Sequence, residues 1–85
     1  MTFALNGNDN RVEYTIYIQK DRFEDEWEKL SDNTVKNLMR KLCGEISSEF
    51  SECYIYGYIY DTDSYSDLAF CEQTVDGNFI FEREQ

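Results

Sequence analysis

The sequence contains no histidine and no proline, and it has only four glycines. Without histidine, Cys43, Cys53 and Cys71 lack the imidazole base that commonly activates a nucleophilic thiol. They form no Cys-x-x-Cys pair that would hold a metal, and the scattered glycines form no phosphate-binding loop. Catalysis by a pair of carboxylates is the one mechanism that the composition leaves open, although acids on exposed strands and loops are usually solvated. We therefore expect no catalytic residue, metal site or cofactor, and a protein that is not an enzyme.

Long hydrophobic runs are also missing. No apolar stretch approaches the ~18 residues of a membrane span, and the first ten residues, MTFALNGNDN, do not resemble a targeting signal. The odd number of cysteines is typical of reduced core residues rather than of a disulfide framework. We expect a cytoplasmic protein with no membrane partner, folded as a single domain over residues 1–85.

Positive charge is scarce in the second half of the chain. Residues 45–85 hold ten acids against Arg83 alone, whereas residues 1–44 hold eight acids and seven bases, within a formal net charge of −10. Such a field repels nucleic acid and attracts basic partners. We expect no direct nucleic-acid binding and instead a basic protein partner. The plainer alternative is that the charge only keeps a small domain soluble.

The hydrophobic pattern of the first half predicts strands followed by helices. Residues 11–19 alternate, with Val12, Tyr14, Ile16 and Ile18 on one side, which is typical of a half-buried strand. The preceding TFAL and the turn-rich NGNDN indicate a short partner strand in a hairpin. From Asp21 the spacing changes to that of a helix, with Phe23, Trp27 and Leu30 inward and Asp21 and Glu24 as a capping box.

A second helix is predicted after a break at SDNT, residues 31–34. Its inward residues would be Val35, Leu38, Met39 and Leu42, and Gly44 would end it. One long bent helix is the alternative.

Strands are predicted at 53–60, about 68–74 and about 78–83, the last two joined by an Asp-Gly turn. Together these elements predict an α+β fold of order (β)β-α-α-β-β-β, an antiparallel sheet of four to five strands with one or two helices packed on one face.

The strand at 53–60 carries a tyrosine at every second position. Cys53, Ile55, Gly57 and Ile59 would face the helices, so Tyr54, Tyr56, Tyr58 and Tyr60 would line the opposite face, and Tyr17 would extend that face if its strand is adjacent. Such a patch suits a protein partner. Alternatively, the tyrosines would stabilise one another across strands or become buried against a second copy in a homodimer. A third alternative is a platform on which nucleic-acid bases stack, but such a platform would need basic surroundings.

The acidic loop DTDSYSD follows directly. Asp61, Asp63, Asp67 and Glu72 occupy positions 1, 3, 7 and 12 of a twelve-residue window, much as in a calcium-binding EF-hand loop. Strand-like flanks and Ser66 at the glycine position disfavour calcium. The alternative is a phosphate-like track, because alternate residues of an extended chain lie ~6.6 Å apart, close to the ~6.8 Å rise of two nucleotide steps.

By size, composition and this acidic stretch, the chain resembles the small acidic proteins that phages use against bacterial defence, namely anti-CRISPR proteins and other DNA mimics. The resemblance implies an inhibitor that occupies the basic nucleic-acid channel of a defence complex in the bacterial cytoplasm. Lys36, Arg40 and Lys41 depart from full-surface mimicry. An immunity protein that neutralises a basic nuclease toxin, and a structural homodimer built on the tyrosine face, are the alternatives.

The predicted partner-binding residues combine aromatic anchors with complementary charge. They are Glu49, Glu52, Tyr54, Tyr56, Tyr58, Tyr60, Asp61, Asp63, Asp67, Glu72 and Asp76.

Overall fold

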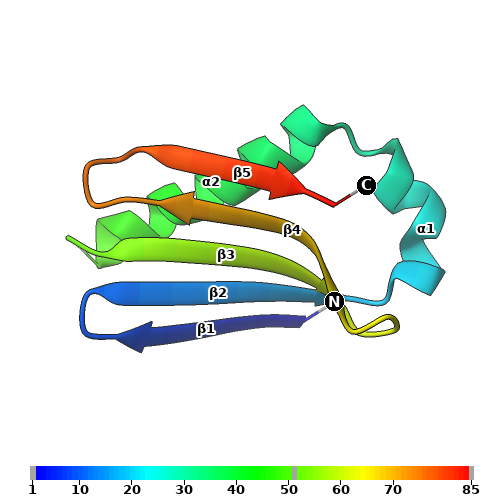
Figure 1. Ribbon diagram of the computed structural model, residues 1–85, viewed down its shortest axis with the longest axis horizontal. Helices are drawn as coiled ribbons and strands as arrows, with labels where there is room; N and C mark the ends of the chain where they lie inside the picture. The colour runs from blue at the N-terminus through cyan, green and yellow to red at the C-terminus, as the bar shows by residue number, and fades with distance from the viewer. Residues whose placement is uncertain (1, 51, 85) are drawn as a thin grey trace.

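The computed structural model describes residues 2–50 and 52–84, and the side chains of these except for residues 23 and 24. Its fold is α+β, with five strands and two helices in the predicted order (Figure 1). The elements are β1 (Thr2–Asn8), β2 (Arg11–Ile18), α1 (Lys20–Lys29), α2 (Asp32–Glu49), β3 (Tyr54–Asp61), β4 (Ser66–Gln73) and β5 (Phe79–Arg83).

The strands lie in one sheet in the order β1-β2-β3-β4-β5. The prediction of a purely antiparallel sheet is wrong at the centre, where β2 and β3 run parallel and Val12 lies beside Ile55. The two helices connect these strands, and α2 carries the chain back along the sheet. Eighteen helical residues span ~27 Å, which matches the ~26 Å of an eight-residue strand, so β3 starts at the same end as β2.

This return path also explains why α2 does not end at Gly44. The helix continues to Glu49, because a helix that stopped at Gly44 would leave the chain well short of the start of β3. The predicted break between the helices is confirmed: Ser31 is the N-cap of α2, and its hydroxyl accepts a hydrogen bond from the Thr34 N–H at 3.1 Å.

Other details of the helices differ from the prediction. The N-cap of α1 is Gln19, so Asp21 lies in the first turn instead of capping it. The side chains of the predicted inward Phe23 and capping Glu24 lie outside the described residues. Leu30 is exposed, and of the predicted inward residues of α2, Val35 and Met39 are buried and Leu42 is partly buried, whereas Leu38 is 48% exposed. The buried residues of α2 are Val35, Met39, Cys43 and Ile46.

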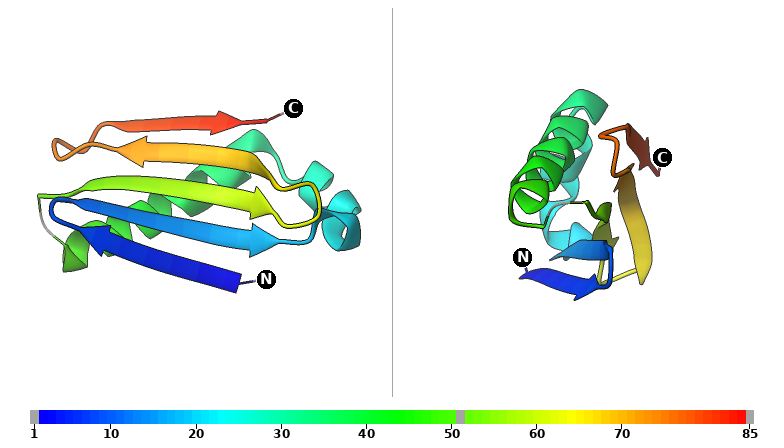
Figure 2. Two further views of the ribbon diagram at one scale, coloured as in Figure 1. Left: turned by 60° about the horizontal axis from the view of Figure 1, so that its bottom comes forward. Right: turned by 90° about the vertical axis from the view of Figure 1, so that its left-hand side faces the viewer.

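Both helices lie on one side of the sheet (Figure 2). The core between the layers contains the predicted inward residues of β2 and β3, with Ile55 and Tyr14 fully buried. Tyr14 fits there because Gly57 is its register neighbour on β3, and any side chain at that position would overlap the Tyr14 ring. The opposite face of the sheet has no helix over it among the described residues.

Candidate partner-binding face

The uncovered side of the sheet, called the open face below, carries the tyrosine row. Tyr54, Tyr56, Tyr58 and Tyr60 alternate with buried residues along β3, as predicted. Tyr54 is 39% exposed, and the other three are half-buried. Because β3 is the middle strand, the row runs along the centre of the open face.

Aromatic neighbours on both sides widen this row. The Tyr17 ring on β2 meets the Tyr60 ring edge-on at a centroid distance of 5.8 Å, so Tyr17 extends the face as predicted. On the other side, Phe70 of β4 packs against Tyr58 at 5.3 Å. Such contacts hold the rings in place and partly explain their half-buried state, since aromatic pairs stabilise one another.

Carboxylates flank the aromatic row on both sides. Glu13 of β2 and Glu72 of β4 are both register partners of Tyr56, which places them on either side of this ring about two strand spacings, or ~10 Å, apart. Glu82 of β5 lies beside Phe70, and Asp67 lies beside Tyr60. The open face therefore has an aromatic centre within an acidic rim.

Among the described residues, Arg11 is the one cation of this face, and it is already engaged. Its guanidinium lies 2.6 Å from the Glu13 carboxylate and 4.2 Å from the centre of the Tyr56 ring. The hydrogen bond that Arg11 donates to Glu13 raises the pKa of Arg11. Burial, and then the Glu13 carboxylate, raise the pKa of Tyr58, so its phenol stays protonated and can donate a hydrogen bond to a partner.

The acidic loop between β3 and β4 is built differently from the prediction, because Asp61 points inward. Asp61 is only 2% exposed. Its Oδ1 accepts the N–H groups of Lys20 at 3.0 Å and Asp63 at 3.1 Å, and its Oδ2 accepts the Ser64 hydroxyl at 2.7 Å. The Ser64 hydrogen bond leads the effects that lower the pKa of Asp61, and the backbone N–H groups add to it.

Asp61 therefore serves the fold and is not available to a partner, which corrects its place among the predicted contact residues. Its carboxylate holds the start of α1, where unpaired N–H groups attract negative charge. Asp63 also binds the start of α1, because its carboxylate accepts a 3.3 Å hydrogen bond from the Asp21 N–H, although Asp63 remains exposed. Two carboxylates of the loop thus replace the missing side-chain cap of α1.

Tyr65 stands at the tip of this loop. It is 79% exposed and has φ of 56°, a left-handed conformation that is strained for a bulky residue. Its ring is open to solvent, but it lies in the loop between β3 and β4 and not in the row on the open face.

The remaining predicted acids lie elsewhere. Glu49 ends α2, Glu52 lies between α2 and β3, and Asp76 lies in the turn between β4 and β5. These segments share one end of the sheet, and the β3–β4 loop and α1 lie at the other (Figure 1). The predicted contact residues therefore form no single track, and only the four tyrosines, Asp67 and Glu72 share the open face.

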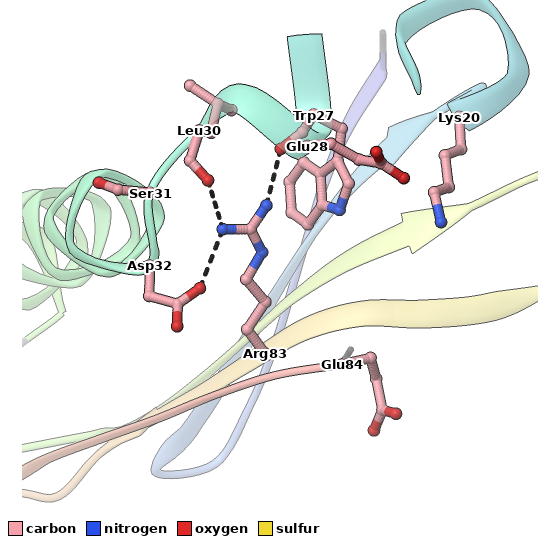
Figure 3. Close-up of a pocket in the computed structure, with 8 residues that line it drawn as sticks. All are labelled: Lys20, Trp27, Glu28, Leu30, Ser31, Asp32, Arg83 and Glu84. Carbon is pink, nitrogen blue, oxygen red and sulfur yellow. Dashed lines mark hydrogen bonds and ion pairs between the residues drawn. The ribbon is translucent and has the colours of Figure 1, made fainter. Parts of the chain in front are cut away.

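Arg83, the lone base of residues 45–85, is also used internally. Its guanidinium donates to the carbonyl oxygens of Trp27 at 2.7 Å and Leu30 at 2.6 Å and to Asp32 at 3.0 Å. It also lies 4.5 Å from the Trp27 ring. Figure 3 shows this clamp in a hollow that Lys20 and Glu84 border. Because Arg83 ties β5 to the end of α1, it does not offset the negative charge of the open face.

The six other basic residues of the chain all lie on the two helices. Lys20, Arg22 and Lys29 belong to α1, and Lys36, Arg40 and Lys41 belong to α2. Arg40 lies 4.9 Å from the centre of the Phe79 ring. The same two helices also carry eight acids, so the helical layer is itself net negative, and the two sides differ in the arrangement of their charges rather than in sign.

Other kinds of site find no support within the described part of the chain. No group of three or more Cys, Asp or Glu side chains there is placed to hold a metal ion. None of the described helices has the length and apolar character needed to cross a membrane. Cys43 and Cys71 are buried free thiols whose sulfurs lie 3.7 Å apart, and the hydrogen bond with Cys71, together with burial, raises the pKa of Cys43.

Sequence reasoning missed Glu13, Phe70 and Glu82 as members or neighbours of this face. For Glu13 the signal was present, because it alternates with the inward Val12 and Tyr14. For Asp61 the period-two pattern that placed Ile55, Gly57 and Ile59 inward also places the next alternate residue inward. Phe70 and Glu82 needed the strand register, which the sequence does not specify.

Comparison with known proteins adds no family to this description. No protein-family model matches the chain, and neither a curated protein nor a solved structure shows significant similarity to it.

Proposed function

We propose that this protein is a stoichiometric inhibitor that binds a basic nucleic-acid-binding protein through its open face, in the manner of phage proteins that block bacterial defence. The observation that carries the proposal is an uncovered sheet face on which a tyrosine row is flanked by the carboxylates of Asp67, Glu72 and Glu82. These three form no ion pair among the described residues, whereas Glu13 and Arg11 pair with each other.

Complementarity favours a basic partner. Tyrosines at the centre of an interface supply large contact areas at low entropic cost, and a carboxylate rim attracts a cationic surface and selects against other surfaces. Phosphate-binding sites present such cationic surfaces, so the rim would occupy the place of nucleic-acid phosphates. The six bases of the helical layer are outnumbered by its eight acids, so this layer does not repel a cationic partner.

The proposed contact set differs from the one that the sequence predicts. The four tyrosines, Asp67 and Glu72 remain, and Glu13, Glu82, Tyr17 and Phe70 join them. Asp61 leaves the set because it is buried. Glu49, Glu52, Asp63 and Asp76 lie at the ends of the sheet, where they would add long-range attraction without central contact.

The immobilised protein should capture a nucleic-acid-binding protein from a bacterial lysate at low salt. Added duplex DNA should release the captured protein, because both ligands compete for one basic surface, and rising salt should also weaken capture. The paired variant Glu72→Lys with Glu82→Lys should abolish capture.

The matched control reverses two charges on the helices, Asp25→Lys on α1 with Glu45→Lys on α2, both exposed, and should retain most of the capture. Equal loss in both variants would show that net charge alone drives binding. A captured protein that DNA does not displace would contradict nucleic-acid mimicry.

The identity of the captured protein separates the two inhibitor classes. A defence complex supports the anti-defence role, whereas a nuclease toxin that loses its activity in the complex supports the immunity role. Both roles use the same face and the same charge complementarity.

A further inference from the structure

The free edge of β1 has none of the features that normally protect a sheet edge. β1 pairs with β2 on one side only, and all of its seven residues are exposed. It is the only described strand without a charged residue, and it contains no proline. The opposite edge strand, β5, has five residues and includes Glu82 and Arg83. Unprotected edges readily pair with another strand.

Two large apolar residues stand on this edge. Phe3 and Leu5 are 50% and 46% exposed, and their register partners Ile16 and Tyr14 place them on the helical side of the sheet. The Phe3 ring stacks beside Tyr14 at 6.0 Å. Because α2 packs over β3, β4 and β5, it leaves these two side chains uncovered.

An apolar hollow continues this surface inward. It has a volume of about 210 Å³, and Ile16, the register partner of Phe3, is part of its wall. The helices contribute Trp27, Leu30 and Leu38 to the same wall. Exposed apolar surface thus runs from the edge strand to the space beneath both helices.

We propose that β1 pairs antiparallel with β1 of a second copy of this chain, around a two-fold axis at Leu5. In this register all seven residues find partners: Leu5 faces the second copy's Leu5, and Phe3 packs over the second copy's Gly7. Gly7 has open space around its Cα, so the ring meets no obstacle there. The strand is therefore complementary to itself.

Charge identifies the second copy as the occupant. Each chain carries a formal charge of −10, so two copies repel wherever their carboxylates meet. β1 offers an edge without carboxylates of its own, and the nearest charged pair on β2, Arg11 with Glu13, neutralises itself. A basic partner gains no attraction at β1 and would be drawn to the open face instead.

Pairing of this kind joins the two sheets into one continuous sheet. A two-fold axis perpendicular to the sheet keeps both helical layers on one side and both open faces on the other. A single pair of seven-residue strands buries less than the ~1,200 Å² of a typical stable interface, so the dimer is reversible and concentration-dependent. The inference rests on β1 alone and does not depend on the proposed function.

Sedimentation equilibrium tests the proposal. Between about 1 μM and about 1 mM protein, the mass should rise from the 10.2 kDa of one chain towards twice that value. Leu5→Lys should hold the mass at one chain throughout, because two ammonium groups would face each other at the two-fold axis.

The matched control is Ile80→Lys on the other edge strand, where the residue is 52% exposed, and it should dimerise like the unaltered protein. Circular dichroism establishes that both variants fold. As a second measurement on the unaltered chain, hydrogen exchange of the β1 amides should slow at least several-fold as concentration rises.

Three results would overturn the proposal. They are a single-chain mass over the whole range, a dimer that survives Leu5→Lys, and β1 exchange that does not depend on concentration. A dimer lost in Tyr56→Lys but kept in Leu5→Lys would place the contact on the open face instead.

Discussion

The two faces of β3 show how one strand serves two purposes. On the covered face, Ile55, Gly57 and Ile59 are buried, and the Tyr14 ring fills the space that Gly57 leaves. On the open face, the alternating tyrosines stay partly exposed, and Tyr58 and Tyr60 contact aromatic rings on the two neighbouring strands. The covered face therefore determines stability, whereas the open face can vary in chemistry at little cost to the fold.

The sharpest test of this division is Gly57→Ala. A Cβ at this position would overlap the ring and hydroxyl of Tyr14, and both neighbouring strands are fixed in the sheet. We expect a loss of about 3 kcal/mol or more in the free energy of unfolding, measured by urea denaturation.

A matched control for Gly57→Ala lies in α2. Gly44→Ala meets nothing within 4 Å and should add up to about 1 kcal/mol, since alanine favours a helix interior. If Gly57→Ala changed the free energy of unfolding by less than Gly44→Ala does, the close packing between Tyr14 and β3 would be contradicted.

Tyr14→Phe probes the polar contact within the covered face. The hydroxyl donates to the Met39 carbonyl oxygen at 3.1 Å and lies 3.2 Å from the Cys71 sulfur. Its removal should cost about 1–2 kcal/mol without disturbing the sheet. Thermal unfolding monitored by near-UV circular dichroism measures the change, and Tyr17→Phe on the open face is the control that should leave the melting temperature almost unchanged.

Asp61→Asn tests the junction between the strand and α1. We expect a fall of about 5 °C in Tm at neutral pH, because the amide replaces a charged acceptor of several hydrogen bonds. Since the folded-state pKa of Asp61 is lowered, its stabilisation is present above the unfolded pKa and is lost as pH falls through the folded pKa.

The difference between the Asp61→Asn variant and the unaltered protein should therefore shrink below about pH 4. Asp67→Asn, on the exposed start of β4, is the control and should leave the Tm almost unchanged at neutral pH. A difference that grows in acid would contradict the assignment of a charged, hydrogen-bonded carboxylate.

The smallest expected effect on stability belongs to the open face. Glu72→Gln with Glu82→Gln should change the free energy of unfolding by less than about 0.5 kcal/mol, as is usual for exposed residues. The same pair should weaken binding to the partner at low salt. Loss of stability comparable to that of Tyr14→Phe would mean that the two faces are not independent.

Much of this division could be read from the sequence, because side-chain alternation in β2 and β3 directly separates buried from exposed residues. The order of elements and the break at Ser31 follow from equally local signals. The parallel pairing of β2 with β3 could not be predicted from local signals, since it depends on the combined path of two helices. The length of α2 depends on the same path. Gly44 was wrongly predicted to end the helix, because a glycine can also lie within one.

The candidate site was less predictable than the fold. The tyrosine row follows from one strand, but its rim requires the register of three others. The acidic loop was the main error, because its high local charge suggested a surface role for every carboxylate. For Asp61, the hydrogen bonds that its carboxylate accepts from backbone N–H groups at the start of α1 outweigh the cost of removing that carboxylate from water.

The parallel contact between β2 and β3 has a consequence for folding. Val12 meets Ile55 only after more than forty intervening residues have been arranged, whereas the β1–β2 hairpin and the β3–β4–β5 meander each close locally. The central seam should therefore form late, because distant contacts carry a larger loop-closure cost. Ile55→Val should accordingly accelerate unfolding more than it slows refolding, so the middle of the sheet would be the last part to be completed and the first to open.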